Sequence, residues 1–469
     1  MQNEILEAAK KLRWETPDHF HDQFTQAVYR ETERLVKKNV RLGEGQQKRR
    51  WEKKLDFILT NKWTAFPMMF LILGVVLWLT IQGANVPCSL LARLLVDQGH
   101  HALQAWTQSL PVWEWLRGLL IDGVYLTTAW VISVMLFPMA IFFPLFTILE
   151  DFGYLPRVAF NMDPLFKKVG AHGKQALTMA MGMGCNAAGV IAARIIDSPR
   201  ERLIAILTNN FCLCNGRWPT QIVLATIFIG AMVPRGMENM MTTACVVGIV
   251  FLGLALTFGS SWLLAKTLLR GEPSTFSLEL PPFRPPRILK TLYTSIIDRT
   301  IFVLWRAILF AMPAGAIIWL VSNISIGERT LAAWGIHFLN PLGWIMGLNG
   351  IILLAYIVAI PANEIIIPTI LMLTVLTNKM SGIGEQGAGV LFETKHSALQ
   401  QLLTASGWTT LTAICLMIFC LSHNPCSTTI YTIWKETRSV KWTAVSILMP
   451  LIIGFILCAM TAALWRGIQ

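Results

Sequence analysis

The sequence predicts an all-α polytopic membrane protein with two helices interrupted at depth. The chain is 54% hydrophobic and only 14% charged, with a mean hydropathy of +0.54, whereas soluble domains contain about 25% charged residues. Several apolar runs exceed the roughly 18 residues that indicate a transmembrane helix. Two apolar runs nevertheless contain polar residues, in GMGCNAAGVIAARI (182–195) and IPANEIIIP (360–368). Irregular backbone at membrane depth is tolerated only where it is buried in protein or lines a cavity.

The basic character of the chain fits a membrane protein better than a nucleic-acid-binding protein. The net charge is +12, but the basic residues gather in loops and near the N-terminus, as the positive-inside rule requires. No basic groove motif with interleaved aromatic residues appears. All of the nine cysteines except Cys88 fall in apolar segments, so we expect no disulfide framework. The polar first sixty residues show no signal peptide.

Four regions are predicted along the chain. They are a cytoplasmic N-terminal helical segment (1–60), a first membrane half (61–268), a cytoplasmic proline-rich linker (269–299) and a second membrane half (300–469). The basic cluster RRWEKK (49–54) indicates topology, with anionic-lipid binding as a less favoured alternative. Seven full spans are expected, with the N-terminus inside and the C-terminus outside, at about 63–81, 123–149, 203–232, 240–264, 300–321, 408–434 and 442–465.

Residues 83–122 are predicted to form an outer, partly interfacial segment. It contains the adjacent pair His100 and His101. Metal capture at an entrance is one interpretation of this pair, but two histidines without further ligands are more often incidental.

The two halves share an order of parts that predicts an inverted repeat. Each half has a span, a broken segment and an interrupted span, and Phe-Cys-Leu precedes the second break at both 211–213 and 419–421. Basic flanks on both sides of 176–196 predict a re-entrant hairpin from the cytoplasmic side, while the hairpin at 348–377 enters from outside. Inverted repeats with discontinuous helices are typical of secondary transporters. Coincidental breaks in a channel or receptor are the alternative.

Glu364 is the only acid in the second broken segment, and a carboxylate in a membrane is by default functional or paired. Two interpretations stay open, which are an ion pair with Arg217 and direct ligand binding. Three cysteines and neighbouring asparagines also lie at helix breaks. Thiol, carboxylate and imidazole together suit a first-row divalent ion such as Fe²⁺, Mn²⁺ or Zn²⁺. The candidate metal ligands are Cys185, Asn186, Cys214, Asn215, Glu364, His423 and Cys426.

Each of these residues also has a structural interpretation. A single buried cysteine is usually a small core residue, and His423 could cap a helix break instead of binding metal. Met179, Met181 and Met183 could offer thioethers but more commonly fill gaps. No enzyme is predicted, because GAHGKQA lacks the phosphate-loop spacing and neither HExxH nor GxSxG occurs.

Several long motifs resemble the membrane domain of the ferrous iron transport protein B family. They are LEDFGYLPRVAFNMDPLFKKVGAHGK (149–174), GMGCNAAGVIAARI, SPRERLIAILTNNFCLCNGR (198–217), LLRGEPSTFSLELPPFRPP (268–286), ANEIIIPT (362–369) and NPCSTTIYTIWKETRSVKWT (424–443). The resemblance covers roughly residues 50–465. It implies transport of Fe²⁺ across the bacterial cytoplasmic membrane, and it makes Cys185, Cys214 and Cys426 the family's gate cysteines.

The chain departs from the family pattern in several places. The family's N-terminal G-protein domain is not found, so either a separate GTPase supplies it, with residues 1–60 as the candidate docking surface, or none does. Ala187 and Ala188 replace a Val-Pro pair, Asn363 replaces a lysine, and Asn424 replaces an apolar residue. These changes leave the choice between iron and manganese open.

The predicted function is transport of a divalent transition metal, Fe²⁺ first, with Mn²⁺ or Zn²⁺ as alternatives. Fe²⁺ would be cargo, and no permanently bound cofactor is expected. The other partners expected are the lipid bilayer, a separate GTPase and further copies of the chain in a homo-oligomer. The competing functions are an organic-solute permease of nucleoside type and a membrane scaffold that recruits a soluble GTPase.

Overall fold

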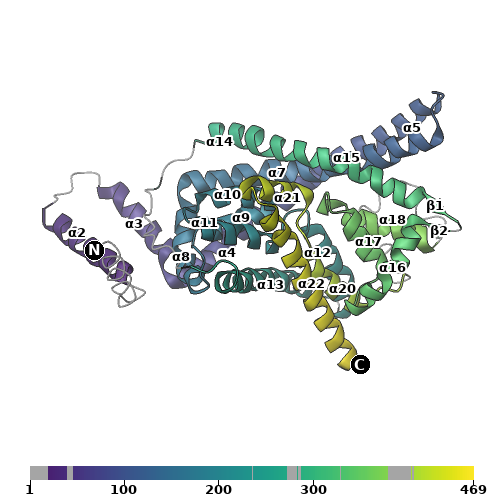
Figure 1. Ribbon diagram of the computed structural model, residues 1–469. Helices are drawn as coiled ribbons and strands as arrows, with labels where there is room; N and C mark the ends of the chain where they lie inside the picture. Colours follow the sequence, from purple (N-terminus) through teal and green to yellow (C-terminus); the bar gives the residue numbers. More distant parts are fainter. Residues whose placement is uncertain are drawn as a thin grey trace, which may run out of the picture.

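The computed structural model describes residues 20–39, 46–234, 236–271, 283, 287–327, 329–378, 403 and 406–468. The predicted loop 379–405, except for Leu403, and residues 272–282 and 284–286 of the predicted linker 269–299 lie outside these residues. The described chain is almost entirely helical (Figure 1). Among the described residues, six helices are long and apolar enough to cross a membrane, or seven if one bent pair counts as a span. The predicted all-α polytopic class is therefore confirmed.

The first two spans form a long helical hairpin. Helix α4 (Lys62–Ala92) runs without a break through η1 (Arg93–Gly99) into α5 (His100–Gln108). The chain then returns through α6 (Glu114–Arg117), η2 (Gly118–Tyr125) and α7 (Leu126–Phe152). The first helix therefore continues to Gln108, well beyond the predicted end of the first span near residue 81 and through much of the segment 83–122 that was predicted to be outer and partly interfacial. The extension projects well beyond the other helices (Figure 1).

The first re-entrant hairpin consists of α9 (Gln175–Gly184), α10 (Asn186–Ala192) and η3 (Ala193–Ile195). It is preceded by α8 (Tyr154–Lys168). The predicted span 203–232 follows as two short pieces, divided at Cys212–Arg217 as the polar run there indicates. The pieces are α11 (Pro199–Thr208) with η4 (Asn209–Phe211), and α12 (Trp218–Leu224) with η5 (Ala225–Ile229) and η6 (Gly230–Met232).

The second half has the same order. After α13 (Glu238–Lys266), the span of α14 (Ile288–Thr294), η7 (Ser295–Ile301) and α15 (Phe302–Asn323) leads to a short turn of two strands, β1 (Ser325–Ile326) and β2 (Arg329–Thr330). Helix α16 (Leu331–Ile345), which the sequence did not predict, bends by 111° into α17 (Gly350–Val358). The second hairpin continues through η8 (Asn363–Ile365) into α18 (Ile366–Asn378). The last elements are α20 (Thr410–Ser422), α21 (Ser427–Thr437) and α22 (Val440–Ile468).

The N-terminal segment is helical as predicted, with α2 (Phe20–Asn39) and α3 (Gln46–Thr60) at one end of the molecule (Figure 1). Its attachment is an ion pair between Asp56 of α3 and the fully buried Arg157 of α8, with Oδ1 and Nε 2.9 Å apart. Asn161 adds a hydrogen bond to the carbonyl of Leu59. These contacts fix the start of α4 against α8.

Contacts between loops divide the molecule into two sides. The side predicted to be cytoplasmic holds the ion pairs Asp56–Arg157, Glu150–Arg299, Lys174–Asp197 and Arg194–Glu436. On the opposite side Gly118 packs against Trp319, Thr410 contacts Met232, and Arg466 donates to the carbonyl of Trp344. The first hairpin starts from the former side, at Lys174, and the second follows α16 on the latter. The hairpins therefore enter from opposite sides.

Candidate functional site

The tips of the two hairpins have the same backbone geometry. An extended residue leads into the second arm of each tip, Cys185 with φ −151° and ψ 121° and Ala362 with φ −149° and ψ 118°. An asparagine follows each, Asn186 and Asn363. Each tip also accepts a backbone hydrogen bond from the interrupted span of its own half. Asn215 donates to Gly184 at 3.1 Å, and Ser427 donates to Ile360 at 3.0 Å.

The two tips and both interrupted spans surround a narrow central cavity of about 30 Å³. This volume holds about two water molecules or one partly dehydrated ion. Three of the predicted thiols, Cys185, Cys214 and Cys426, line it. The remaining lining includes Asn186, Asn215, Glu364, Asn363, Thr428 and the α7 residues Met135 and Met139.

The ends of short helices favour anionic ligands around this cavity. Cys185 immediately precedes α10, Cys426 precedes α21, and Glu364 lies in the first turn leading into α18. The free amide groups and partial positive charge of a helix N-terminus favour carboxylate and thiolate. The Cys426 thiol also lies 3.2 Å from the Thr429 hydroxyl. A divalent cation would complete the charge balance.

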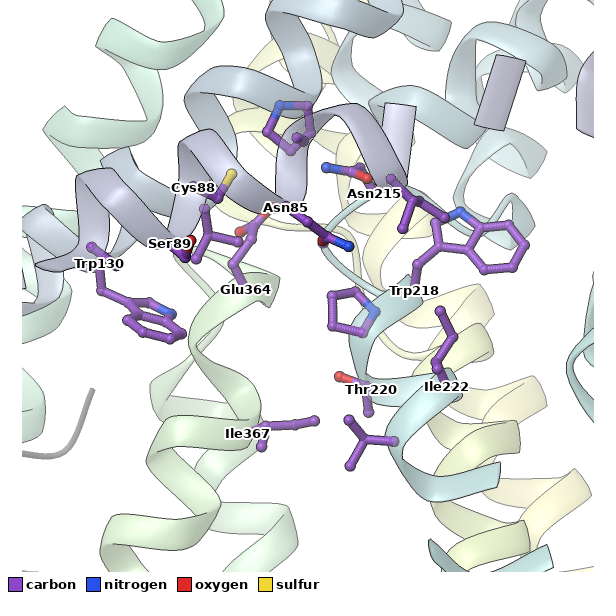
Figure 2. A pocket seen from close by; sticks show the side chains of 18 of the residues that line it. Asn85, Cys88, Ser89, Trp130, Asn215, Trp218, Thr220, Ile222, Glu364 and Ile367 are labelled. Atoms are coloured by element: carbon purple, nitrogen blue, oxygen red, sulfur yellow. The ribbon is translucent and has the colours of Figure 1, made fainter. Parts of the chain in front are cut away.

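Larger spaces reach the central cavity from both sides. The outer vestibule, about 570 Å³, lies between α4, α7, α12 and α18 and extends down to Asn215 and Glu364 (Figure 2). The inner vestibule, about 490 Å³, is lined by Met181, Ala188 and the ion pair Arg194–Glu436, among others. Asn215 and Glu364 line both the outer vestibule and the central cavity, and Val303 lines both the inner vestibule and the central cavity. The three spaces therefore form a series across the molecule.

Glu364 is half-buried and packs against the backbone of the first interrupted span, where a β-carbon at Gly216 would overlap its carboxylate. No ion pair to Glu364 occurs among the residues that the structure describes. Of the two interpretations left open by the sequence, the geometry favours ligand binding over an ion pair with Arg217.

Arg217 is fully buried and holds the interrupted spans of the two halves together. Its Nη1 donates to the carbonyls of Asn210 at 2.8 Å and Leu421 at 3.0 Å. Its Nη2 donates to the Asn210 side chain at 3.0 Å and lies 3.4 to 3.5 Å from the carbonyls of His423 and Asn424. The guanidinium therefore donates hydrogen bonds to carbonyls that the breaks leave without helical partners, which is a structural role.

His423 does not line the central cavity. Its ring packs edge-on against Tyr356, with centroids 4.8 Å apart, and its carbonyl accepts a hydrogen bond of 2.6 Å from Asn210. Asn186 is buried, and its amide, once its nitrogen and oxygen are exchanged, donates to the carbonyls of Gly182 and Cys212. Asn186 thus orients the tip that carries Cys185.

In the histidine pair at the far end of the outer hairpin, His100 has a structural role. His100 lies 2.7 Å from the Asp122 carboxylate and 3.3 Å from the Gln104 amide. Within the described part of the chain, no three His, Cys, Asp or Glu side chains are close enough to hold a metal ion. The three central thiols nevertheless line one cavity.

The sequence reasoning missed several lining residues. Met135 and Met139 are one helical turn apart on α7 and present thioethers to the cavity, whereas the methionines singled out at 179 and 183 do not line it. Their spacing of four residues in a predicted span was the available signal. Thr428 was missed because it follows the break rather than forming it.

The fold and the cavity define a helical membrane protein in which two oppositely inserted hairpins meet at the centre. Comparison with known proteins shows which family the chain resembles. Residues 132–229 match a Gate model described as "Nucleoside recognition", and residues 246–298 match "Ferrous iron transport protein B C terminus". The resemblance to the ferrous iron transport protein B family is thereby confirmed.

Curated relatives show the same resemblance. The chain is 28% identical to the Fe(2+) transporter FeoB of Staphylococcus aureus (strain MSSA476), with 88% of this chain and 59% of that protein aligned. It is 28% identical to the Synechocystis protein of the same name (76% and 55% covered) and 23% identical to that of Campylobacter jejuni (85% and 62% covered). The chain thus spans about three-fifths of the length of these relatives. No solved structure matches.

Proposed function

We propose that this chain forms the membrane pathway of a bacterial ferrous iron transporter located in the cytoplasmic membrane. The observation that carries the proposal is the series of three spaces, with the narrow middle one lined by three thiols and a carboxylate. A volume of about 30 Å³ is too small for a nucleoside, so this cavity does not support the organic-solute alternative.

Passage of the ion would follow from the chemistry of the lining. Cys185, Cys214, Cys426 and Glu364 replace part of the water shell, because thiolate and carboxylate suit Fe²⁺ and disfavour Mg²⁺ and Ca²⁺. Hydrogen bonds from the Asn186 side chain and from the Asn215 backbone amide stabilise the first break. The carbonyl of His423 accepts a hydrogen bond that stabilises the second break. Movement of either broken hairpin changes which vestibule reaches the cavity, which is alternating access at an inverted repeat.

Uptake of radioactive iron into proteoliposomes tests this proposal. Serine keeps the size of cysteine but removes the soft donor, so Cys185→Ser and Cys426→Ser should reduce Fe²⁺ uptake by about tenfold or more. The matched controls are Cys245→Ser and Cys458→Ser. Cys245 lies 4.0 Å from the sulfur of Met417, and the Cys458 thiol donates to the carbonyl of Cys415, both away from the central cavity.

The control variants should transport almost normally. Equal activity of all four variants would show that the cysteines are packing residues, and absence of uptake by the unmodified chain would favour the scaffold function. For energy supply we propose a separately encoded GTPase that docks on residues 1–60. Calorimetry should then detect no GTP binding by this chain alone.

A further inference from the structure

The outer vestibule contains a polar face on a helix that is otherwise apolar. Gln82, Asn85 and Ser89 recur at intervals of three and four residues on α4, so they lie on one face of the helix. All three line the vestibule. The adjoining face carries Val86 and Leu90, which are 74% and 61% exposed as expected of lipid-facing side chains. Polar side chains facing lipid would be unfavourable, so this face is built for the vestibule.

The oxygens of this face are available to a ligand. The Ser89 hydroxyl donates to the carbonyl of Val86 at 2.9 Å, which leaves its oxygen lone pairs free to accept. Asn85 is exposed, and its side chain makes no hydrogen bond within the described residues. Figure 2 shows Asn85 and Ser89 around the same space as Glu364, which rises from the second hairpin.

Carboxylates lie at both ends of the polar face. Asp97 lines the mouth of the vestibule, and Glu364 forms its floor. Asn85 and Asp97 are separated by about 18 Å along the helix, as the rise per residue requires. Arg93, one turn from Asp97, makes no ion pair with it within the described part of the chain. The vestibule thus offers oxygen ligands from mouth to floor with a single thiol, Cys88, whereas three thiols line the central cavity beyond Glu364.

The geometry points to a second cation site, in which Asn85, Ser89 and Glu364 receive the divalent ion with part of its water shell before it reaches the thiols. This inference rests on the proposed function and adds an entry site to it. Oxygen ligands suit a hydrated first-row ion, whereas thiols select among such ions. Glu364 borders both spaces, so it contacts the ion on either side of the transfer. Loading is therefore governed mainly by charge and hydration, and selection by the three thiols of the central cavity.

A charge series at Asn85 tests the entry site. The KM for Fe²⁺ should fall several-fold in Asn85→Asp and rise by about tenfold or more in Asn85→Lys, because the charge acts at short range on the ion. The maximal rate should change little in Asn85→Asp. The matched controls are Asn323→Asp and Asn323→Lys at the end of α15, where Asn323 donates to the carbonyl of Trp319 and does not line the outer vestibule. Equal changes in KM in the Asn85 and Asn323 series would show that the charge acts only through the surface potential, and would overturn the proposed entry site.

A binding measurement separates this inference from the proposed function. Mn²⁺ bound to the purified full chain in detergent is followed by electron paramagnetic resonance, which needs no transport. Mn²⁺ binding should persist in Cys185→Ser, tighten in Asn85→Asp and be lost in Asn85→Lys. Unchanged binding in Asn85→Lys would overturn the entry site even if iron uptake is normal. Failure of iron uptake by the unmodified chain, with Mn²⁺ binding intact and dependent on Asn85, would reject only the transport function.

Discussion

At the scale of single residues, Arg217 carries the most unusual environment. Its guanidinium satisfies carbonyls from both halves without a carboxylate partner at hydrogen-bond distance. A lysine has fewer donors on a compact head and cannot span these acceptors. The buried acceptors left without partners would each destabilise the fold.

Arg217→Lys should therefore lower stability by about 3 kcal/mol and reduce Tm by several degrees in detergent. Differential scanning fluorimetry of the purified protein measures this change. The control is Arg329→Lys at the exposed turn between α15 and α16, which should leave Tm nearly unchanged. If both variants have the same Tm, the hydrogen-bond network around Arg217 does not stabilise the breaks.

The dependence of uptake on pH also belongs to this scale. Metal binding by thiols releases protons, so Fe²⁺ uptake should fall as the pH is lowered from about 8 to about 6.5. Two groups at the base of the first hairpin do not titrate in this range. A hydrogen bond from Lys174 holds the pKa of Asp197 below its ordinary value of 3.8, and burial holds the pKa of His172 below 6.5.

The directions of these two pKa shifts determine the pH range over which uptake can be compared without a change in protein stability. Asp197 stabilises the hairpin above pH 3.8, and this stabilisation is lost only when the pH falls through its lowered pKa. Neutral His172 is favoured in the folded state, so stability declines once the pH falls below 6.5. Uptake measured with an imposed constant pH on both sides of the membrane should fall while the Tm stays level. A flat uptake profile would argue against thiolate ligands.

At the scale of elements, the first hairpin depends on close approach of its two arms. β-Carbons at Gly182 of α9 and Gly189 of α10 would each lie 2.6 Å from the side-chain oxygen of Asn209. Asn209 in turn donates to the carbonyl of Asn186 at 2.9 Å, just after the tip. A methyl group at position 189 would also meet the carbonyl of Thr178 at 2.7 Å. Glycine is required here for packing rather than for its backbone angles.

Gly189→Ala should therefore separate α9 from α10, destabilise the protein by about 1 to 3 kcal/mol and impair uptake. Thermal unfolding and iron uptake measure the two effects. Gly259→Ala on α13 is the matched control, because a β-carbon there meets no atom within 4 Å and alanine favours helix. A Gly189→Ala variant as stable and active as the control would show that the packing of α9 against α10 accommodates a β-carbon at this position.

At the scale of the whole molecule, the two hairpins enter from opposite sides, and the basic loops should lie inside. In a Cys88→Ser background, a membrane-impermeant maleimide applied to spheroplasts should label Ser325→Cys and not Asp197→Cys. Both positions are exposed and lie on opposite sides of the fold. The Cys88→Ser change is needed because Cys88 lines the open outer vestibule. Labelling of Asp197→Cys alone would show that the orientation in the membrane is the reverse of the one proposed.

Much of this molecule could be predicted from local sequence. Long apolar runs define the spans, and small or polar residues at depth define the breaks at Cys185 and near Asn363, because a helix in lipid can be interrupted only where the freed backbone groups find partners. The motifs around these breaks also carried the family resemblance, which the comparisons confirmed. The predicted first span ended near residue 81 because polar residues follow there. These polar residues recur at helical spacing among apolar ones, and the helix continues through them.

Only the tertiary structure decided which of these residues meet. Opposite charge suggested Arg217 as the partner of Glu364, but packing gives Arg217 the carbonyls of the second break and leaves Glu364 at the boundary between vestibule and cavity. His423 looked like a ligand because it lies at a break, yet its ring faces Tyr356. Side-chain direction at a break depends on how helices distant in sequence pack around it. Sequence spacing determines which face of a helix a residue occupies, and packing determines what that face meets.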